Sequence, residues 1–189
     1  MNPSPALQAA LAETARAIDA RFDALLTIPD DARAGLYRAM RHAAIGGGKR
    51  LRPLLVFATA QIFGCDRDGV ARVGTAIEAI HVYSLIHDDL PAMDDDDMRR
   101  GKPTVHKAFD EATAILAGDS LQTLAFEIIA APETPLDDCR KVELMLALSR
   151  AAGIGGMAGG QMFDLQAETE NPDEAGIIRL QAMKTGALI

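Results

Sequence analysis

Carboxylate side chains crowd into one short segment of the sequence. Six of the ten residues from 88 to 97 are aspartates, namely Asp88, Asp89 and the run from Asp94 to Asp97. Neighbouring carboxylates raise each other's pKa unless a cation neutralises them. Divalent ions such as Mg2+ take oxygen ligands and usually keep waters and substrate phosphates in their shell. An apolar helical pattern runs into Asp88, so the segment predicts a cation site beside the core, with a solvated acidic loop as the weaker alternative.

Basic residues lie on both sides of the aspartates along the chain. The segment Gly46-Gly47-Gly48-Lys49-Arg50-Leu51-Arg52-Pro53 has three cations within four positions, just before an expected helix start. Free N–H groups at a helix start and arginine guanidinium groups suit a diphosphate. A second basic segment, Arg99-Arg100-Gly101-Lys102, directly follows the aspartates. The pattern predicts a metal and cations that hold a diphosphate from two sides; mutual neutralisation of neighbouring charges is the alternative.

Single positions exclude two common ion-binding motifs. A calcium loop of the EF-hand type that began at Asp94 would need glycine where Arg99 stands. A Walker phosphate loop would need glycine at position 43 and serine or threonine at position 50, where the chain has Ala43 and Arg50. The predicted site must therefore hold its ions in another way.

A histidine shares a helix face with the first aspartate. His81, Ser84 and Asp88 are separated by three, four and seven positions, so they lie on one side of a helix. At 1.5 Å per residue, His81 lies ~10 Å from Asp88, a reach that suits a substrate with phosphates at one end. A histidine packed in the core or lying at the surface is the alternative interpretation.

The elements that must position these residues are predicted to be helices nearly throughout the chain. Apolar residues at spacings of three and four predict helices at 6–26 and 31–45, after Pro53, and at about 70–90, 110–130, 137–152 and 173–189. No segment alternates strictly enough to require a strand. The glycine-rich segment from Gly153 to Gly160 predicts either a loop or a close approach between helices or to a ligand. The expected architecture is all-α, in a single domain over 1–189.

Composition narrows the possible partners and location. The net charge is −8, but the chain is nearly neutral outside residues 88–97, because those six aspartates belong to 27 acidic residues set against 19 basic ones. With no Trp and only 2 Tyr, this balance argues against a nucleic-acid partner. No apolar run reaches the ~18 residues of a membrane span. Residues 1–5 lack a signal-peptide pattern and there are only 2 Cys, so a reducing cytoplasm is expected.

Together the motifs resemble those of the short-chain trans-prenyltransferases, bacterial farnesyl diphosphate synthases in particular. The stretch from Asp88 to Asp94, followed by residues 99–104, is similar to the first aspartate-rich motif of that family. The family's other blocks match in order from about residue 35 to the end: residues 47–53, Gly118-Asp119, residues 160–165 and Lys184-Thr185-Gly186. Five ordered motifs form a specific signature.

The resemblance implies an isoprenoid synthase bundle of antiparallel helices around a deep cavity, assembled as a homodimer. Its implied reaction condenses isopentenyl diphosphate with dimethylallyl or geranyl diphosphate into (2E,6E)-farnesyl diphosphate, using Mg2+ or alternatively Mn2+. Residues that match metal ligands are Asp88 and Asp94, with Asp89 in support. Residues that match contacts to isopentenyl diphosphate are Gly48, Lys49, Arg52, His81 and Arg100.

The remaining implied roles concern the allylic substrate and the product. Residues that match contacts to the allylic substrate are Arg99, Lys184, Thr185, Gln161 and Asp164. Neutralising the departing diphosphate requires positive charge, so the expected catalytic residues are Asp88 and Asp94 with their metal, Arg99 and Lys184. Residues that match positions controlling chain length are Tyr83, expected to form a steric floor, and Ser84.

One departure from the family pattern predicts an incomplete site. Nothing after Asp97 reads as the second aspartate-rich motif, and the apolar pattern continues to Ile189, which predicts a chain truncated before the final third of the domain. The alternatives are a catalytically silent subunit or an inactive fragment of a prenyl diphosphate synthase. A metal phosphohydrolase with a His87-Asp88 centre fits less well, because His42, His81 and His106 form no obvious ligand set.

Overall fold

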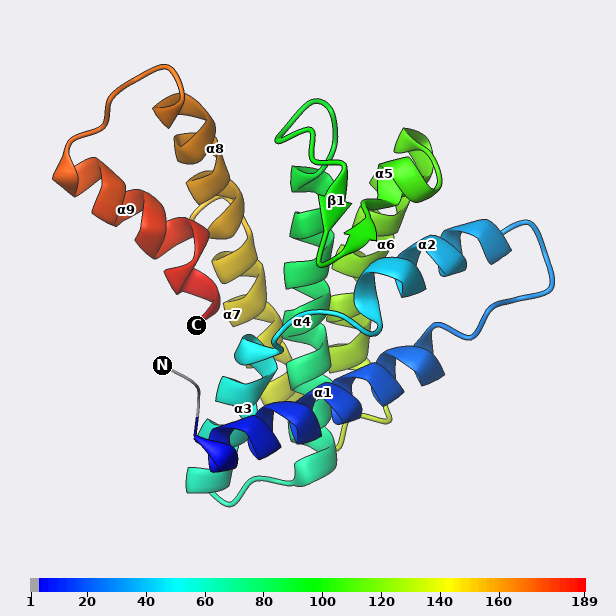
Figure 1. Ribbon diagram of the computed structural model, residues 1–189. Coiled ribbons are helices and arrows are strands. Elements are labelled where there is room, and N and C mark those ends of the chain that lie inside the picture. The colour runs from blue at the N-terminus through cyan, green and yellow to red at the C-terminus, as the bar shows by residue number, and fades with distance from the viewer. Residues whose placement is uncertain (1–3) are drawn as a thin grey trace. The chain divides into compact units, whose positions relative to one another are not determined.

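The computed structural model describes residues 4–189, which are largely helical (Figure 1). The helices are α1 (Pro5–Leu25), α2 (Ala34–Ala44), α3 (Leu51–Ile62), α4 (Arg67–Asp88), α5 (Val105–Ala108), α6 (Glu111–Ala130), α7 (Asp138–Ala152), α8 (Met157–Ala167) and α9 (Glu174–Lys184), followed by a 3-10 turn, η1 (Gly186–Leu188). The predicted all-α architecture is confirmed. The last predicted helix, however, ends as an α-helix at Lys184 rather than at residue 189.

Aspartates begin several of these helices. Asp66, Asp110, Asp137 and Asp173 each stand at the N-cap of a helix and accept a hydrogen bond from a backbone N–H in its first turn. A capping carboxylate satisfies a backbone donor that has no partner within the helix, and its charge complements the positive end of the helix dipole. These four aspartates, among the acidic residues outside 88–97, therefore help to define where helices start.

The chain divides into two compact units, an N-terminal unit that reaches to Pro135 and a C-terminal unit over Leu136–Ile189. The prediction of a single domain over 1–189 stays a prediction, and residues 1–3 lie outside the described residues. In the N-terminal unit α4 and α6 lie side by side (Figure 1). Their facing residues are fully or almost fully buried, among them Ala76, Ile80, Ala117, Leu121 and Ala125. Alanines let the two helices approach closely, and this pair forms the centre of the core.

A two-stranded hairpin interrupts the helical pattern after the aspartates. Strands β1 (Met98–Arg99) and β2 (Lys102–Pro103) pair antiparallel, with Arg99 opposite Lys102. The two residues between them, Arg100 and Gly101, both have positive φ, at 54° and 79°. Two successive left-handed residues are what a tight type I′ hairpin turn requires. The expectation of no strand was wrong here, because a strand of two residues is too short to carry a periodic pattern.

The glycine-rich segment of the C-terminal unit fulfils both predicted roles. Residues 153–156 form the turn between α7 and α8, whereas Gly159 and Gly160 lie inside α8. A Cβ on Gly160 would lie 2.6 Å from the Cα of Lys184, so only glycine lets α8 and α9 pack this closely. The close approach brings the start of α8 against the end of α9.

Among the described helices, α6 is long and apolar enough by length and composition to cross a membrane. The sequence-based expectation that no stretch reaches that length was too strict. The face of α6 that packs against α4 is buried, whereas Ile115 and Leu116 on the same helix are exposed.

Candidate functional site

The aspartate segment folds back onto the end of α4. Helix α4 ends at Asp88, and the backbone N–H of Asp94 donates to the carbonyl oxygen of Asp88 at 2.8 Å. The N–H of Asp95 donates in the same way to the carbonyl of Leu90 at 3.2 Å. The backbones of the first and last aspartates of the predicted ligand set are therefore directly joined at the C-terminal end of the helix. The partial negative charge of that helix end adds to the carboxylates and favours a cation.

Asp89 is engaged with the hairpin. Its side chain is buried, and the Nε of Arg99 donates to its Oδ1 at 2.5 Å. Burial raises the pKa of the Asp89 carboxyl, although the hydrogen bond from Arg99 opposes that shift. Arg99 also contacts the Asp96 carboxylate at 3.2 Å. The ion pair fastens β1 to the end of α4. The support of a metal predicted for Asp89, like the roles predicted for the other site residues, remains a prediction.

The fold brings together the two basic segments that the sequence separates by about fifty residues. Gly48 has a φ of +84°, and a Cβ on it would lie 2.6 Å from the guanidinium carbon of Arg100. Lys102 donates from its Nζ to the carbonyl oxygen of Ile45 at 3.3 Å. Gly47, Asp89, Arg99, Arg100 and Lys102 also line one shared small cavity. The loop before α3 and the hairpin after the aspartates thus form one basic surface.

A half-buried arginine and histidine extend this basic surface. The Nε of Arg52 is buried and has no hydrogen-bond partner among the residues that the structure describes. Burial lowers the pKa of Arg52. Burial, and then repulsion from Arg52 and Arg100, lowers the pKa of His81 to about 3, so its imidazole is neutral at pH 7. An unpaired buried guanidinium N–H beside a neutral imidazole is a donor suited to an anionic ligand.

Arg50 differs from its neighbours in the same basic segment. Its side chain is buried, and it donates to Glu78 at 2.7 Å and to Asp19 at 2.6 Å. Its backbone is left-handed, with a φ of 50°. The interpretation of Arg50 as one of three phosphate-facing cations was therefore wrong, because its charge is already neutralised inside the core. Glu78, a carboxylate in the middle of an apolar helix, was the feature of the sequence that could have indicated a buried basic partner. Lys49, by contrast, is exposed.

Tyr83 and Ser84 lie on α4, one turn before the aspartates. Tyr83 is buried, and its ring meets the ring of His87 edge to face, with centroids 5.8 Å apart. Burial raises the pKa of the Tyr83 hydroxyl, which also hydrogen-bonds to the side chain of Gln122. The Ser84 hydroxyl donates to the carbonyl oxygen of His81 at 2.9 Å. Tyr83, on α4, thus reaches α6 through its hydrogen bond to Gln122.

The C-terminal unit brings together the predicted residues that it carries. The Nζ of Lys184, at the end of α9, lies 2.5 Å from Oδ2 of Asp164 on α8. Gln161 precedes Asp164 by one helical turn, and Thr185 directly follows Lys184. The close packing at Gly160 brings these two helices together. Within this unit, Lys184 and Asp164 are in direct contact, and the roles predicted for all four residues remain predictions.

Comparison with known proteins defines the class to which this fold and site belong. Residues 33–189 match the family model described as polyprenyl synthetase, and the chain belongs to that family. The predicted resemblance is confirmed, and membership implies the use of a divalent metal. The phosphohydrolase alternative is thereby removed.

Individual relatives narrow the comparison further. The chain is 52% identical over 151 residues to a farnesyl diphosphate synthase of Escherichia coli, a match that covers 79% of this chain and 50% of that protein. It is 47% identical over 175 residues to the farnesyl diphosphate synthase of Haemophilus influenzae, covering 92% of this chain and 57% of that protein. The chain spans about half the length of these curated relatives.

Solved structures agree with this grouping. An apo FPP/GFPP synthase from Zymomonas mobilis matches with a TM-score of 0.94 and 56% identity, covering 96% of this chain and 66% of that one. A geranyltransferase from Legionella pneumophila matches with a TM-score of 0.90 and 38% identity, covering 96% and 65% of the two chains. The all-α isoprenoid synthase fold is therefore confirmed.

Proposed function

We propose that this chain is part of a prenyltransferase that condenses isopentenyl diphosphate with dimethylallyl or geranyl diphosphate to give farnesyl diphosphate. The observation that carries the proposal is Arg52, whose buried Nε has no partner among residues 4–189. Leaving a buried donor unpaired costs about 1–3 kcal/mol, more when it is charged, and an anionic ligand removes that cost. The adjoining surface of Gly47, Gly48 and Arg100 supports a diphosphate as that anion.

We propose Mg2+ as the metal, with Mn2+ able to replace it, and Asp88 and Asp94 as its ligands. Carboxylate oxygens at the negative end of α4 fit a hard divalent cation. When bound there, such an ion supplies neutralising charge for the leaving diphosphate. Arg99 and Lys184 would contribute further positive charge to that leaving group.

The proposed reaction needs no protein nucleophile. The C–O bond between the allylic carbon and its diphosphate breaks, and the double bond of isopentenyl diphosphate attacks the resulting carbocation to form the new C–C bond. A proton then leaves the product and is accepted by the departed diphosphate. In this scheme Lys49, Arg52 and Arg100 bind isopentenyl diphosphate, and the neutral His81 offers it a hydrogen bond without charge. Gln161, Asp164 and Thr185 adjoin the allylic substrate.

We further propose that Tyr83 limits the product to fifteen carbons, with Ser84 beside it. The ring of Tyr83 is fixed by its contacts with His87 and Gln122, so a growing chain could not push it aside. The proposed assembly is a cytoplasmic homodimer. Its support is the exposed apolar surface of α6, where Ile115 and Leu116 are 45% and 55% exposed.

A product assay tests the proposal. The chain is incubated with Mg2+, dimethylallyl diphosphate and labelled isopentenyl diphosphate, and the expected product is farnesyl diphosphate. Arg52→Gln should weaken the binding of inorganic diphosphate at least tenfold. Arg33→Gln is the control, because Arg33 is exposed and pairs with Asp31. Tyr83→Ala should lengthen the product.

The outcomes separate the alternatives. Diphosphate binding that depends on Arg52, without any product, would favour an inactive fragment or a catalytically silent subunit. Binding that is equal in Arg52→Gln and Arg33→Gln would contradict the proposed substrate site.

A further inference from the structure

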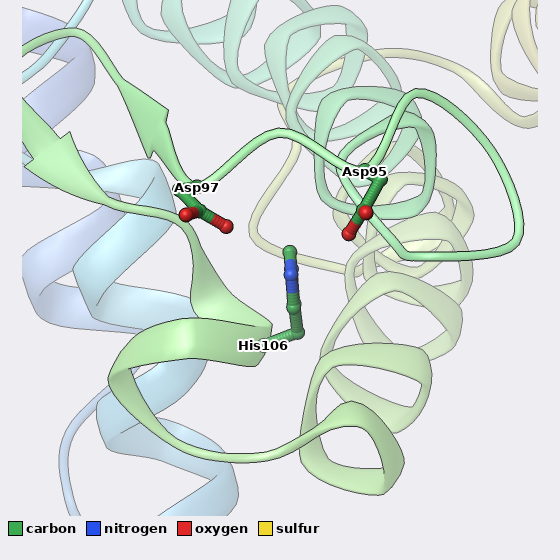
Figure 2. Close-up of side chains that lie close together, drawn as sticks. All are labelled: Asp95, Asp97 and His106. Carbon is green, nitrogen blue, oxygen red and sulfur yellow. The ribbon is translucent and has the colours of Figure 1, made fainter.

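A histidine that sequence analysis left unassigned faces two aspartates of the acidic segment. Asp95, Asp97 and His106 each offer one ligand atom, and the three atoms lie within 4.8 Å of one another. Figure 2 shows the tip of the His106 ring between the two carboxylates. The aspartates are exposed, whereas His106, on α5, is only 8% exposed. None of the three belongs to the ligand set proposed above.

The hydrogen bonds around His106 define which ring nitrogen carries its proton. The hydroxyl of Thr104 donates its single proton to the backbone carbonyl of Asp96 at 2.8 Å, because a carbonyl can only accept. The same Thr104 oxygen lies 3.2 Å from Nδ1 of His106. Since the hydroxyl proton is already used, Nδ1–H must be the donor in that contact. In the neutral ring, Nε2 is then left with a free lone pair.

That lone pair is buried and unused. The Nε2 atom has no hydrogen-bond partner within the described part of the chain. Metal-binding histidines characteristically donate one ring N–H to an oxygen of the protein and coordinate the metal through the other nitrogen. His106 fits this arrangement, because Thr104 is an oxygen at Nδ1, Nε2 is buried without a partner, and the tip of the ring lies between the carboxylates of Asp95 and Asp97 (Figure 2).

We propose that Asp95, Asp97 and Nε2 of His106 form a second divalent cation site, separate from the one at Asp88 and Asp94. Imidazole nitrogen favours ions of the transition series such as Zn2+, whereas Mg2+ prefers an all-oxygen shell. The inference does not depend on the proposed prenyltransferase activity. A bound ion would tie the aspartate segment to α5 and thereby fix the β1–β2 hairpin that lies between them.

The geometry requires only small movements to close on an ion. Ligands ~2.1 Å from a tetrahedral Zn2+ are about 3.4 Å apart, so the cluster must contract by roughly an ångström. The two exposed aspartates can make that movement by rotating their side chains, while the buried ring stays in position. Lys107 pairs with Asp97 at 2.8 Å, and the ion must compete with that contact for one carboxylate oxygen.

The wild-type ring provides the first test, which needs no variant. Long-range 1H–15N NMR spectra of the histidine rings, recorded without metal at pH 7.5, should show His106 protonated on Nδ1 alone. Adding one equivalent of Zn2+ should shift the Nε2 resonance of His106. A ring protonated on Nε2, or on both nitrogens, before metal is added would overturn the proposal.

Zn2+ affinity provides the second test. The background carries Asp88→Asn and Asp94→Asn, which remove the other proposed site, and Cys65→Ser and Cys139→Ser, because both thiols are exposed. In this background calorimetry should detect one Zn2+ equivalent. Its affinity should fall at least tenfold in His106→Gln and in Asp97→Asn.

Asp96→Asn is the matched control for that measurement. It removes one negative charge from the same exposed segment at a residue outside the cluster, one that pairs with Arg99, so Zn2+ affinity should change much less than in the other two variants. If all three variants weaken Zn2+ equally, binding reflects the charge of the segment and the proposed site is wrong. If none of them does, Zn2+ binds elsewhere and the proposed site is again wrong.

Discussion

The guanidinium of Arg100 occupies the space in which a side chain of residue 48 would have to lie. A Cβ on Gly48 would meet the guanidinium carbon at 2.6 Å, and the φ of Gly48 is +84°. Two independent features therefore favour glycine at this position. One is the left-handed backbone, and the other is the packing of the hairpin arginine over the loop before α3.

Gly48→Ala should consequently weaken diphosphate binding as well as stability. The left-handed backbone alone costs a residue other than glycine about 1–2 kcal/mol. Displacement of Arg100 should add a loss of affinity for inorganic diphosphate, measured by calorimetry. Gly64→Ala is the matched control, because Gly64 has a φ of +64° but nothing within 4 Å of its missing Cβ. Equal diphosphate affinity in the two variants would contradict the role given to Arg100.

The buried ion pair of Arg50 and Glu78 should dominate the stability of the N-terminal unit. Both side chains are almost fully buried and lie 2.7 Å apart. Arg50→Met leaves Glu78 as an uncompensated buried charge, which typically costs 3–5 kcal/mol. Urea denaturation should show a loss of about that size, and adding Glu78→Gln should recover part of it.

Arg33→Met is the control for this measurement. Arg33 and Asp31 form an ion pair with the same separation of 2.7 Å, but both side chains are exposed. Exposed ion pairs contribute little because water and salt screen them. No measurable change is therefore expected, and a loss as large as that of Arg50→Met would show that burial is not the cause.

The sequence predicted which segments form the site better than it predicted the direction of each side chain. The aspartates at the end of a long apolar helix and the two basic segments were identifiable by residue type and spacing. Arg50 and Arg52 look equivalent in the sequence, yet one is neutralised by Glu78 and the other keeps an unpaired N–H. That difference depends on long-range packing with α4, which no local pattern encodes.

The other features that the sequence did not predict lie in short irregular segments. The turn at Arg100 and Gly101 forms a hairpin with two-residue strands, which are too short for periodicity to reveal. His106 was considered only together with His42 and His81, as a ligand set that did not fit, because its proximity to Asp95 and Asp97 appears only after the hairpin has folded back. The one indication in the sequence was Thr104, a polar residue two positions before His106 that could contact its ring.

His81 should make stability depend on pH. Its pKa falls from 6.5 to about 3 on folding, so between these values the unfolded chain binds a proton that the folded chain excludes. Stability from this group is fully present above pH 6.5 and decreases as the pH falls toward 3, by up to about 1.4 kcal/mol per pH unit. The free energy of unfolding of wild type should therefore fall relative to that of His81→Gln as the pH decreases from 6.5 to 4.5. Parallel urea-denaturation curves for the two proteins across that range would contradict the expectation.

Gly118→Ala should separate α4 from α6. A Cβ on Gly118 would overlap the ring of His87, which is already held by a 3.1 Å hydrogen-bond contact between its Nε2 and the carbonyl oxygen of Ile115. Because α4 and α6 form the centre of the core, relieving this overlap should cost about 1–3 kcal/mol despite the better helix propensity of alanine.

Gly35→Ala separates that packing cost from helix propensity. Gly35 lies in α2 with nothing within 4 Å of its missing Cβ, so alanine there should stabilise the fold by a few tenths of a kcal/mol up to about 1 kcal/mol. The melting temperatures of the two variants should shift in opposite directions relative to wild type. If Gly118→Ala also raised the melting temperature, the ring of His87 must be able to move away from the added methyl group. The contact between His87 and Tyr83 would then not hold the Tyr83 ring in place.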